Sequence, residues 1–137
     1  MKLRALFVYG TLRVGEGNYP LLRGAVERYE EDATIQGDLF FVSGPGSYPV
    51  ADLDGKETIT GDVLWVHPKH EGVQRADAME RGAGYEVREV KATLPGGETI
   101  LVTAYHYLNR WDRRGEQIKD GDWRRAVNEW EANHDRD

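Results

Sequence analysis

One carboxylate in the sequence lies where charged residues are rarely placed. Within a predicted helix over residues 69–81, Val73, Ala76 and Met79 repeat at the spacing of an apolar stripe. At about 100° per residue, Glu80 falls angularly between Ala76 and Val73. Charged residues are almost never fully buried unless paired, so Glu80 either reaches solvent from the helix end or is buried for a purpose. Partial burial would raise its pKa above about 4.3 and suit it to moving protons near neutral pH.

A second candidate for chemistry is the polar corner that ends the first apolar run. The run "LFV" reaches Tyr9, and Gly10, Thr11 and Leu12 follow it. Glycine permits close backbone approach and an unusual turn, so the N–H groups of residues 10–12 can point into a cavity. Such groups suit a ligand carboxylate or a developing oxyanion. The alternative is a plain turn that ends a strand.

Several other chemistries find no support in the sequence. The chain has no cysteine, which excludes disulfides, thiolate metal sites and cysteine nucleophiles. Its two serines, Ser43 and Ser47, lie outside any nucleophile-elbow pattern, and no phosphate loop or dinucleotide loop is present. His67 and His70, followed by Glu71, lack a third ligand at a matching spacing. We therefore predict neither a metal nor a cofactor.

Composition and charge bound the class of protein. With 137 residues, 39% of them apolar and 31% charged, the chain predicts one globular domain over residues 1–137. Its net charge of −6 disfavours nucleic acid as a partner, and the Arg-rich stretch 110–125 is interleaved with acidic residues. The N-terminal apolar stretch "ALFVYG" is too short for a signal peptide or a membrane span. We expect no membrane partner and a cytoplasmic location.

Strands dominate the predicted structure. A hairpin is predicted at "LPGGE", a helical turn near Leu21 and Leu22, and a surface loop over residues 109–122. A second helix is predicted over residues 121–134, capped by Asp120 or Asp122, with Trp123, Val127 and Trp130 as its packing stripe. The predicted strands cover residues 3–9, 25–29, 34–42, 48–51, 58–66, 85–94 and 99–108.

Five stretches, taken in order, carry a family resemblance. "VYGTLR" is similar to a strand-and-loop signature, and "GEGN" at residues 15–18 to the glycine and asparagine that follow it. "SYPVADLDGKETITGDV" is similar to a Tyr-Pro segment that leads into a Gly-Glu strand. "ADAMERGAGYEV" is similar to a helix end with a catalytic glutamate, and "IKDGDW" to a C-terminal Ile-x-x-Gly-Asp-Trp. Together they resemble the γ-glutamylcyclotransferase-like, or AIG2-like, family over nearly the whole chain.

The resemblance implies a fold and a reaction. The implied fold is α+β, a small, mostly antiparallel β-barrel with flanking helices and a cavity at one side. In the implied reaction the α-amine of a γ-glutamyl substrate attacks its own γ-carbonyl, which releases 5-oxoproline and an amine or amino acid. Glu80 stands at the position of the family's general acid/base. Because the nucleophile belongs to the substrate, the protein needs no reactive serine or cysteine.

The resemblance also implies a set of substrate-binding residues. The corner N–H groups would bind the α-carboxylate and Glu80 the ammonium, while a tyrosine hydroxyl would orient Glu80 or the substrate. Asn18 can instead cap a turn, and the two later tyrosines can instead be core aromatics. The implied substrate-binding residues are Tyr9, Gly10, Thr11, Leu12, Asn18, Tyr85 and Tyr107.

Three positions depart from the family pattern. Arg81 replaces the glycine after the glutamate, Ala76 replaces a leucine, and Asp62 stands where glutamate is usual. Arg81 can select a carboxylate-bearing leaving group from the pocket mouth or simply face solvent. These departures leave the identity of the leaving amine open, and the sequence does not indicate the oligomeric state. An alternative function is a non-catalytic module that binds small carboxylated ligands in the same pocket, and a third is an interaction protein with a vestigial pocket.

Overall fold

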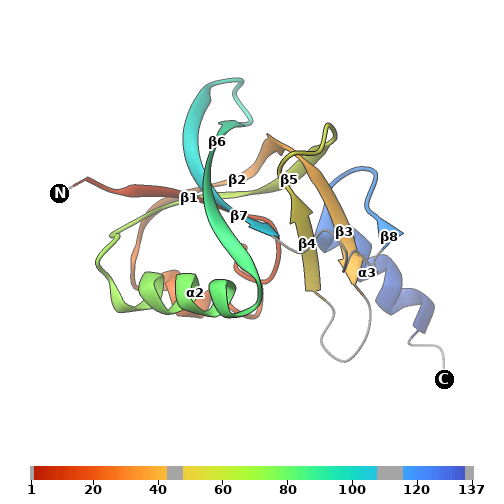
Figure 1. Ribbon diagram of the computed structural model, residues 1–137, viewed down its shortest axis with the longest axis horizontal. Coiled ribbons are helices and arrows are strands. Elements are labelled where there is room, and N and C mark those ends of the chain that lie inside the picture. Colours follow the sequence, from red (N-terminus) through yellow and green to blue (C-terminus); the bar gives the residue numbers. More distant parts are fainter. Residues whose placement is uncertain (1, 43–47, 108–115, 135–137) are drawn as a thin grey trace.

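The computed structural model describes residues 2–42, 48–107 and 116–134. Within these ranges the chain forms eight strands and three helices (Figure 1). None of these helices is long and apolar enough to cross a bilayer. The elements are β1 (Arg4–Val8), α1 (Pro20–Arg23), β2 (Val26–Gln36), β3 (Asp38–Val42), β4 (Tyr48–Asp52), β5 (Thr58–Val66), α2 (Glu71–Gly82), β6 (Tyr85–Thr93), β7 (Thr99–Tyr107), β8 (Glu116–Gln117) and α3 (Trp123–His134).

Five strands close into a barrel in the order β1-β5-β2-β6-β7. Neighbouring strands are antiparallel except β1 and β7, which run parallel and close the barrel. A second sheet, in the order β4-β3-β8, lies beside the barrel together with α3, and α2 lies below the barrel strands in Figure 1. The expected α+β fold, a mostly antiparallel barrel with flanking helices, is confirmed.

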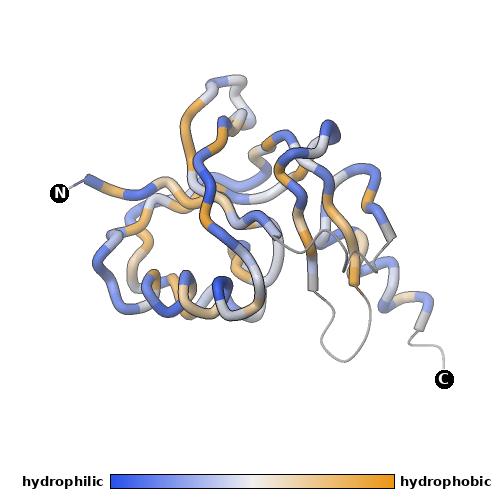
Figure 2. The backbone as a smooth tube through the Cα atoms, viewed as in Figure 1, coloured by the Kyte–Doolittle hydropathy of each residue, from blue (hydrophilic) through white to orange (hydrophobic). Residues whose placement is uncertain are grey.

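Strand β1 is buried on both of its faces, which explains the unbroken apolar run at the start of the sequence. Because successive side chains of a strand point to opposite faces, Phe7 packs with the barrel and α3 cluster, whereas Leu6 and Val8 pack with the cluster under α1 and α2. All three side chains are at most 1% exposed. Figure 2 shows hydrophobic and hydrophilic stretches alternating along the strands and helices.

The break between β2 and β3 is not where the sequence pattern placed it. We predicted a break near residues 30–33 and a continuous strand over 34–42. Instead β2 continues through a bulge between Glu30 and Ala33, where Asp32 adopts a φ of 61°. The chain turns at Gly37, where an added Cβ would lie 2.8 Å from the Ile59 side chain. Close packing at this glycine lets the chain pass from the barrel to the second sheet.

The predicted hairpin and helix α3 are confirmed. Strands β6 and β7 pair antiparallel around "LPGGE", whose Gly97 has a φ of 94°. Asp122 caps α3, since its Oδ1 accepts the Arg125 N–H at 3.3 Å, and Trp130 packs against Phe41 with ring centroids 6.1 Å apart. The predicted loop over 109–122 is wrong at β8, which pairs with β3. Residues 108–115 lie outside the described ranges.

Candidate functional site

A cavity of about 330 Å³ lies where β1 ends, beside the C-terminal turns of α2. All eight candidate site residues line it, although they come from four separate parts of the chain. The volume falls at the lower end of small-molecule sites, so the cavity suits a small ligand. Its lining residues are Val8, Tyr9, Gly10, Thr11, Leu12, Asn18, Pro49, Met79, Glu80, Ala83, Tyr85, Tyr105 and Tyr107.

Glu80 is the one acidic or basic side chain, apart from the tyrosines, among the described lining residues. It is partly buried, and burial, together with the neighbouring Asp77 carboxylate, raises its pKa to about 7. Val73 and Ala76 are buried as the stripe predicted, but Met79 is 45% exposed. Met79 lies one residue before Glu80 near the cavity mouth, and its place on the core-facing stripe was a wrong prediction.

The corner after β1 presents its backbone to the cavity. Its turn is closed by the Arg13 N–H, which donates to the Gly10 carbonyl at 3.0 Å. Gly10 is required for close approach, since an added Cβ would lie 2.5 Å from Pro49 Cγ, and its φ is not left-handed. Within the described ranges, the N–H groups of residues 10, 11 and 12 donate to no protein acceptor. They are therefore available to an anionic group in the cavity.

Asn18 fixes the far side of this corner. Its Nδ2 donates to Thr11 Oγ1 at 2.9 Å, and its backbone N–H donates to the Thr11 carbonyl at 2.9 Å. Asn18 thus lines the cavity and stabilises the loop at the same time. The hydrogen bonds support the turn-capping interpretation, and a role of Asn18 in substrate binding stays a prediction.

Four tyrosines form much of the remaining wall. The Tyr9 hydroxyl donates to the Tyr105 carbonyl at 3.0 Å, and the Tyr85 hydroxyl donates to the Pro49 carbonyl at 2.5 Å. Tyr107 packs its ring against Tyr85 with centroids 5.1 Å apart. Burial raises the pKa of both Tyr9 and Tyr105, so their phenols stay neutral. These contacts make the tyrosines a rigid wall, with the Tyr85 hydroxyl engaged by the backbone.

Tyr105 was missed by the sequence analysis, and strand geometry explains how it could have been found. Alternate residues of a strand share a face, so Tyr105 must lie on the same face of β7 as Tyr107. The resemblance pointed only to Tyr107. His106, between them, is buried on the opposite face and accepts the Leu53 N–H at 3.0 Å through Nδ1.

Behind the cavity wall, Asp77 joins three elements. Arg4 on β1 binds it with two hydrogen bonds, Nη1 to Oδ2 at 2.7 Å and Nη2 to Oδ1 at 3.1 Å. The Tyr105 hydroxyl donates to Asp77 Oδ1 at 2.7 Å. Arg4 Nε also donates to Thr103 Oγ1 at 2.8 Å. This network connects β1, β7 and the helix that carries Glu80.

A buried ion pair supports the corner from beneath. Arg13, 1% exposed, donates through Nη2 to Oδ1 of the fully buried Asp62 at 3.0 Å. The second Asp62 oxygen accepts the Val14 N–H at 2.9 Å, and Arg13 Nη1 lies 3.3 Å from Asp122 at the start of α3. Sequence reasoning quoted both partners but did not predict the pair, because nothing local links residues 49 positions apart.

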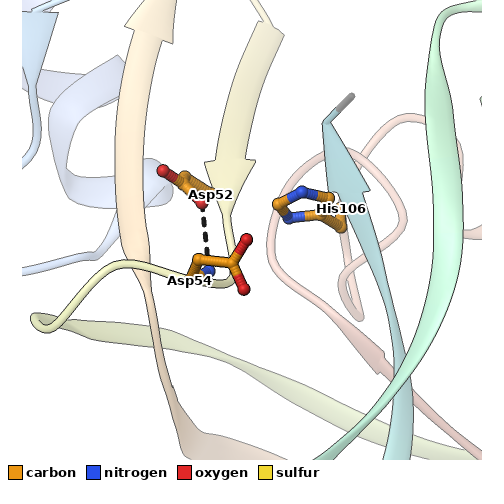
Figure 3. A group of neighbouring side chains, drawn as sticks. All are labelled: Asp52, Asp54 and His106. Carbon is orange, nitrogen blue, oxygen red and sulfur yellow. Dashed lines mark hydrogen bonds between the residues drawn. The ribbon is translucent and has the colours of Figure 1, made fainter. Parts of the chain in front are cut away.

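One further group of side chains has the composition of a metal site. Asp52, Asp54 and His106 face one another between β4 and β7, with ligand atoms within 4.8 Å (Figure 3). However, Arg88 Nη1 already lies 2.7 Å from Asp54 Oδ1, and His106 Nδ1 accepts the Leu53 N–H. Burial and the Arg88 charge lower the pKa of His106, which keeps its imidazole neutral. Asp54 and His106 Nδ1 therefore already have protein partners, and a metal ion at this group would have to compete with them.

The histidines near the start of α2 serve separate purposes. His70 Nδ1 accepts the Gly72 N–H at 2.9 Å and caps the helix. His67 Nε2 lies 2.9 Å from Glu27 Oε2 on β2. Because the two rings have different partners, they do not form the paired donor set that the "HPKH" spacing had raised for consideration.

Comparison with known proteins decides the family. The family model described as "Gamma-glutamyl cyclotransferase, AIG2-like" matches residues 6–125, which contain every lining residue of the cavity. The chain belongs to the AIG2-like γ-glutamyl cyclotransferase family. No curated protein matches the sequence significantly.

Solved structures of AIG2-like and other proteins share the fold. The uncharacterised protein PH0828 from Pyrococcus horikoshii is 27% identical, with a TM-score of 0.66 over 96% of this chain and 98% of that one. YkqA from Bacillus subtilis is 25% identical, with a TM-score of 0.70 over 95% of this chain, which spans only 43% of YkqA. A structure titled "Gamma-glutamyl cyclotransferase" is 20% identical, with a TM-score of 0.63 over 85% and 70% of the two chains. At that identity the likeness shows the fold alone.

The structure places the three departures from the AIG2-like pattern. Arg81 is exposed and is not among the described residues that line the cavity, which favours the solvent-facing interpretation. Ala76 is fully buried on the core-facing side of α2, and Asp62 forms the buried pair with Arg13. None of the three contributes a side chain to the described cavity wall.

Proposed function

We propose that this AIG2-like protein is a γ-glutamyl cyclotransferase that converts a γ-glutamyl amine or γ-glutamyl amino acid into 5-oxoproline and the free amine. One observation carries the proposal. A carboxyl group with a pKa of about 7 shares a small cavity with three backbone N–H groups that have no acceptor among the described residues. This combination supplies a proton carrier and an anion site.

The substrate's charges match these two parts of the cavity. A γ-glutamyl group carries an α-carboxylate and an α-ammonium on the same carbon. The carboxylate binds the N–H groups of residues 10–12, and the ammonium lies against Glu80. Holding both groups curls the chain so that the α-nitrogen approaches the γ-carbonyl carbon, which makes five-membered ring closure an intramolecular reaction.

The proton balance needs no other reactant. The Glu80 carboxylate takes a proton from the α-ammonium, and the freed nitrogen attacks the γ-carbonyl carbon. The C–N bond to the leaving amine then breaks while the Glu80 carboxylic acid protonates the leaving nitrogen. The Glu80 carboxylate next takes a second proton from the ring nitrogen and passes it to the released amine. Two of the three ammonium protons end on the released ammonium ion, and the third remains on the lactam nitrogen. A carboxyl with a pKa of about 7 can serve in both directions near neutral pH.

The deciding experiment is release of 5-oxoproline, measured by mass spectrometry, from a panel of γ-glutamyl amines and dipeptides. The wild type is expected to turn over at least one member, and Glu80→Gln is expected to lose about 100-fold or more in kcat while still binding substrate. Glu71→Gln is the matched control, because it makes the same change at an exposed position of α2. Binding of the panel without turnover by the folded wild type would refute the proposal and favour the non-catalytic binding module.

A further inference from the structure

The Asp77 carboxylate has no assigned role, although it lies one helical turn before Glu80. Residues three apart on a helix share a face, and both side chains belong to the same end of α2. Asp77 is 16% exposed and does not line the described cavity. Its charge must therefore act on the cavity through the wall and not by contact with substrate.

The hydrogen bonds of Asp77 hold it against the side of the wall that Tyr105 forms. Arg4 forms a bidentate pair with both carboxylate oxygens, and the Tyr105 hydroxyl donates to Oδ1. Because Arg4 is itself 16% exposed and anchored to Thr103, the pair is shielded and its geometry is fixed. A carboxylate held in this way cannot move into solvent when Glu80 ionises.

We propose that Asp77 is a positioning residue for the cyclotransferase reaction, that its fixed negative charge opposes ionisation of Glu80, and that Arg4 limits this opposition by partly neutralising Asp77. The proposal rests on the proposed function. Asp77 keeps Glu80 poised between base and acid, and the Arg4 cation prevents Glu80 from remaining protonated at neutral pH.

Among the described residues, the other titratable groups that share the cavity wall with Glu80 include no second carboxylate. They are tyrosine side chains contributed by the corner and by β6 and β7, whereas Arg81, the next residue on the helix, is exposed. Like charges disfavour simultaneous ionisation, and after burial, which is the larger cause, the Asp77 carboxylate is the neighbour that raises the pKa of Glu80. The titratable side chains that share the cavity wall with Glu80 are Tyr9, Tyr85, Tyr105 and Tyr107.

The test is the isosteric Asp77→Asn, which retains an acceptor for Tyr105 and removes the charge. Titration of the Glu80 carboxyl carbon by NMR, with the resonance assigned from Glu80→Gln, is expected to show a midpoint about one pH unit lower than in the wild type. The acid limb of kcat/KM for 5-oxoproline release should move by the same amount. At pH 6 this corresponds to roughly a fivefold gain, because the ionised fraction rises.

A second variant should shift the Glu80 titration midpoint in the opposite direction. Arg4→Gln removes the cation and retains Asp77, so the Glu80 midpoint should rise. Glu71→Gln and Arg75→Gln are the matched controls, since they remove the same charges from exposed positions of α2. A Glu80 midpoint in Asp77→Asn equal to that in Glu71→Gln, or shifts of the same sign in Asp77→Asn and Arg4→Gln, would overturn the inference.

The two proposals fail in different ways. If the wild type releases no 5-oxoproline from any substrate, the proposed function fails, whereas the NMR midpoints still decide whether Asp77 controls Glu80. If 5-oxoproline is released and depends on Glu80, but the midpoint and the acid limb do not respond to Asp77, the function stands and this inference fails. A purely structural role for Asp77 would lower the rate without moving either pH value.

Discussion

Glu80→Gln should make the protein more stable at alkaline pH while it removes activity. The carboxyl is held at a pKa of about 7 in the folded chain against 4.5 when it is free in water. Below pH 4.5 the carboxyl is protonated in both states and has no effect; between pH 4.5 and 7 only the unfolded chain ionises, so stability falls as pH rises, and above pH 7 the loss is complete. The difference corresponds to about 3 kcal/mol of lost stability in the wild type at pH 8.

The measurement is the free energy of unfolding in urea for wild type and Glu80→Gln at pH 8 and at pH 4. The gain in the variant should be about 3 kcal/mol at pH 8 and only a few tenths at pH 4. Glu131→Gln, at an exposed position of α3, measures the effect of the same chemical change on the surface. An equal difference between wild type and Glu80→Gln at both pH values would show that burial does not hold the proton on Glu80.

Two further predictions concern the corner. Arg13→Met leaves a buried carboxylate unpaired and should cost about 3–5 kcal/mol in unfolding free energy, whereas Arg125→Met at an exposed ion pair should cost less than about 1 kcal/mol; similar urea midpoints would contradict this. Gly10→Ala places a methyl group against Pro49 and should cost about 1–3 kcal/mol together with substrate affinity. Gly17→Ala places its methyl group in open space and should change neither stability nor substrate affinity. If calorimetry shows that substrate binding weakens equally in Gly10→Ala and Gly17→Ala, the close approach of Gly10 to Pro49 is not what matters for binding.

Local patterns predicted the parts of the molecule that short-range physics determines. The hairpin at "LPGGE" follows from two strand-like runs around a glycine turn, and the unusual position of Glu80 followed from helical periodicity alone. Met79 was misplaced because periodicity gives the angle around a helix but not how far a neighbouring strand extends to cover it. Asn18, Tyr85 and Tyr107 came from the family resemblance, and the cavity that they share with Glu80 and the corner is a property of the folded chain.

The features that the sequence did not predict depend on contacts between residues far apart in the chain. The β2 bulge depends on Asp32, whose N–H lies 3.3 Å from Asp62 Oδ1, a contact that no sequence window contains. The Arg13–Asp62 pair has the same origin. Tyr105 could have been found from strand alternation next to Tyr107, but its bond to Asp77 requires knowing which helix packs behind β7. Tertiary contacts therefore decided both the strand boundaries and the support of the site.

The anion site that we propose at the corner consists of backbone, and this affects how the site can vary. Every amino acid except proline carries the N–H donor, so side-chain substitution at residues 11 and 12 does not remove the donors themselves. The direction of these N–H groups depends on the path of the backbone. That path is held by the packing of Pro49 against Gly10 and by the Arg13–Asp62 pair. Residues that never touch a ligand can thus restrict which sequences retain the site, while its recognising atoms stay the same in any chain that follows this path.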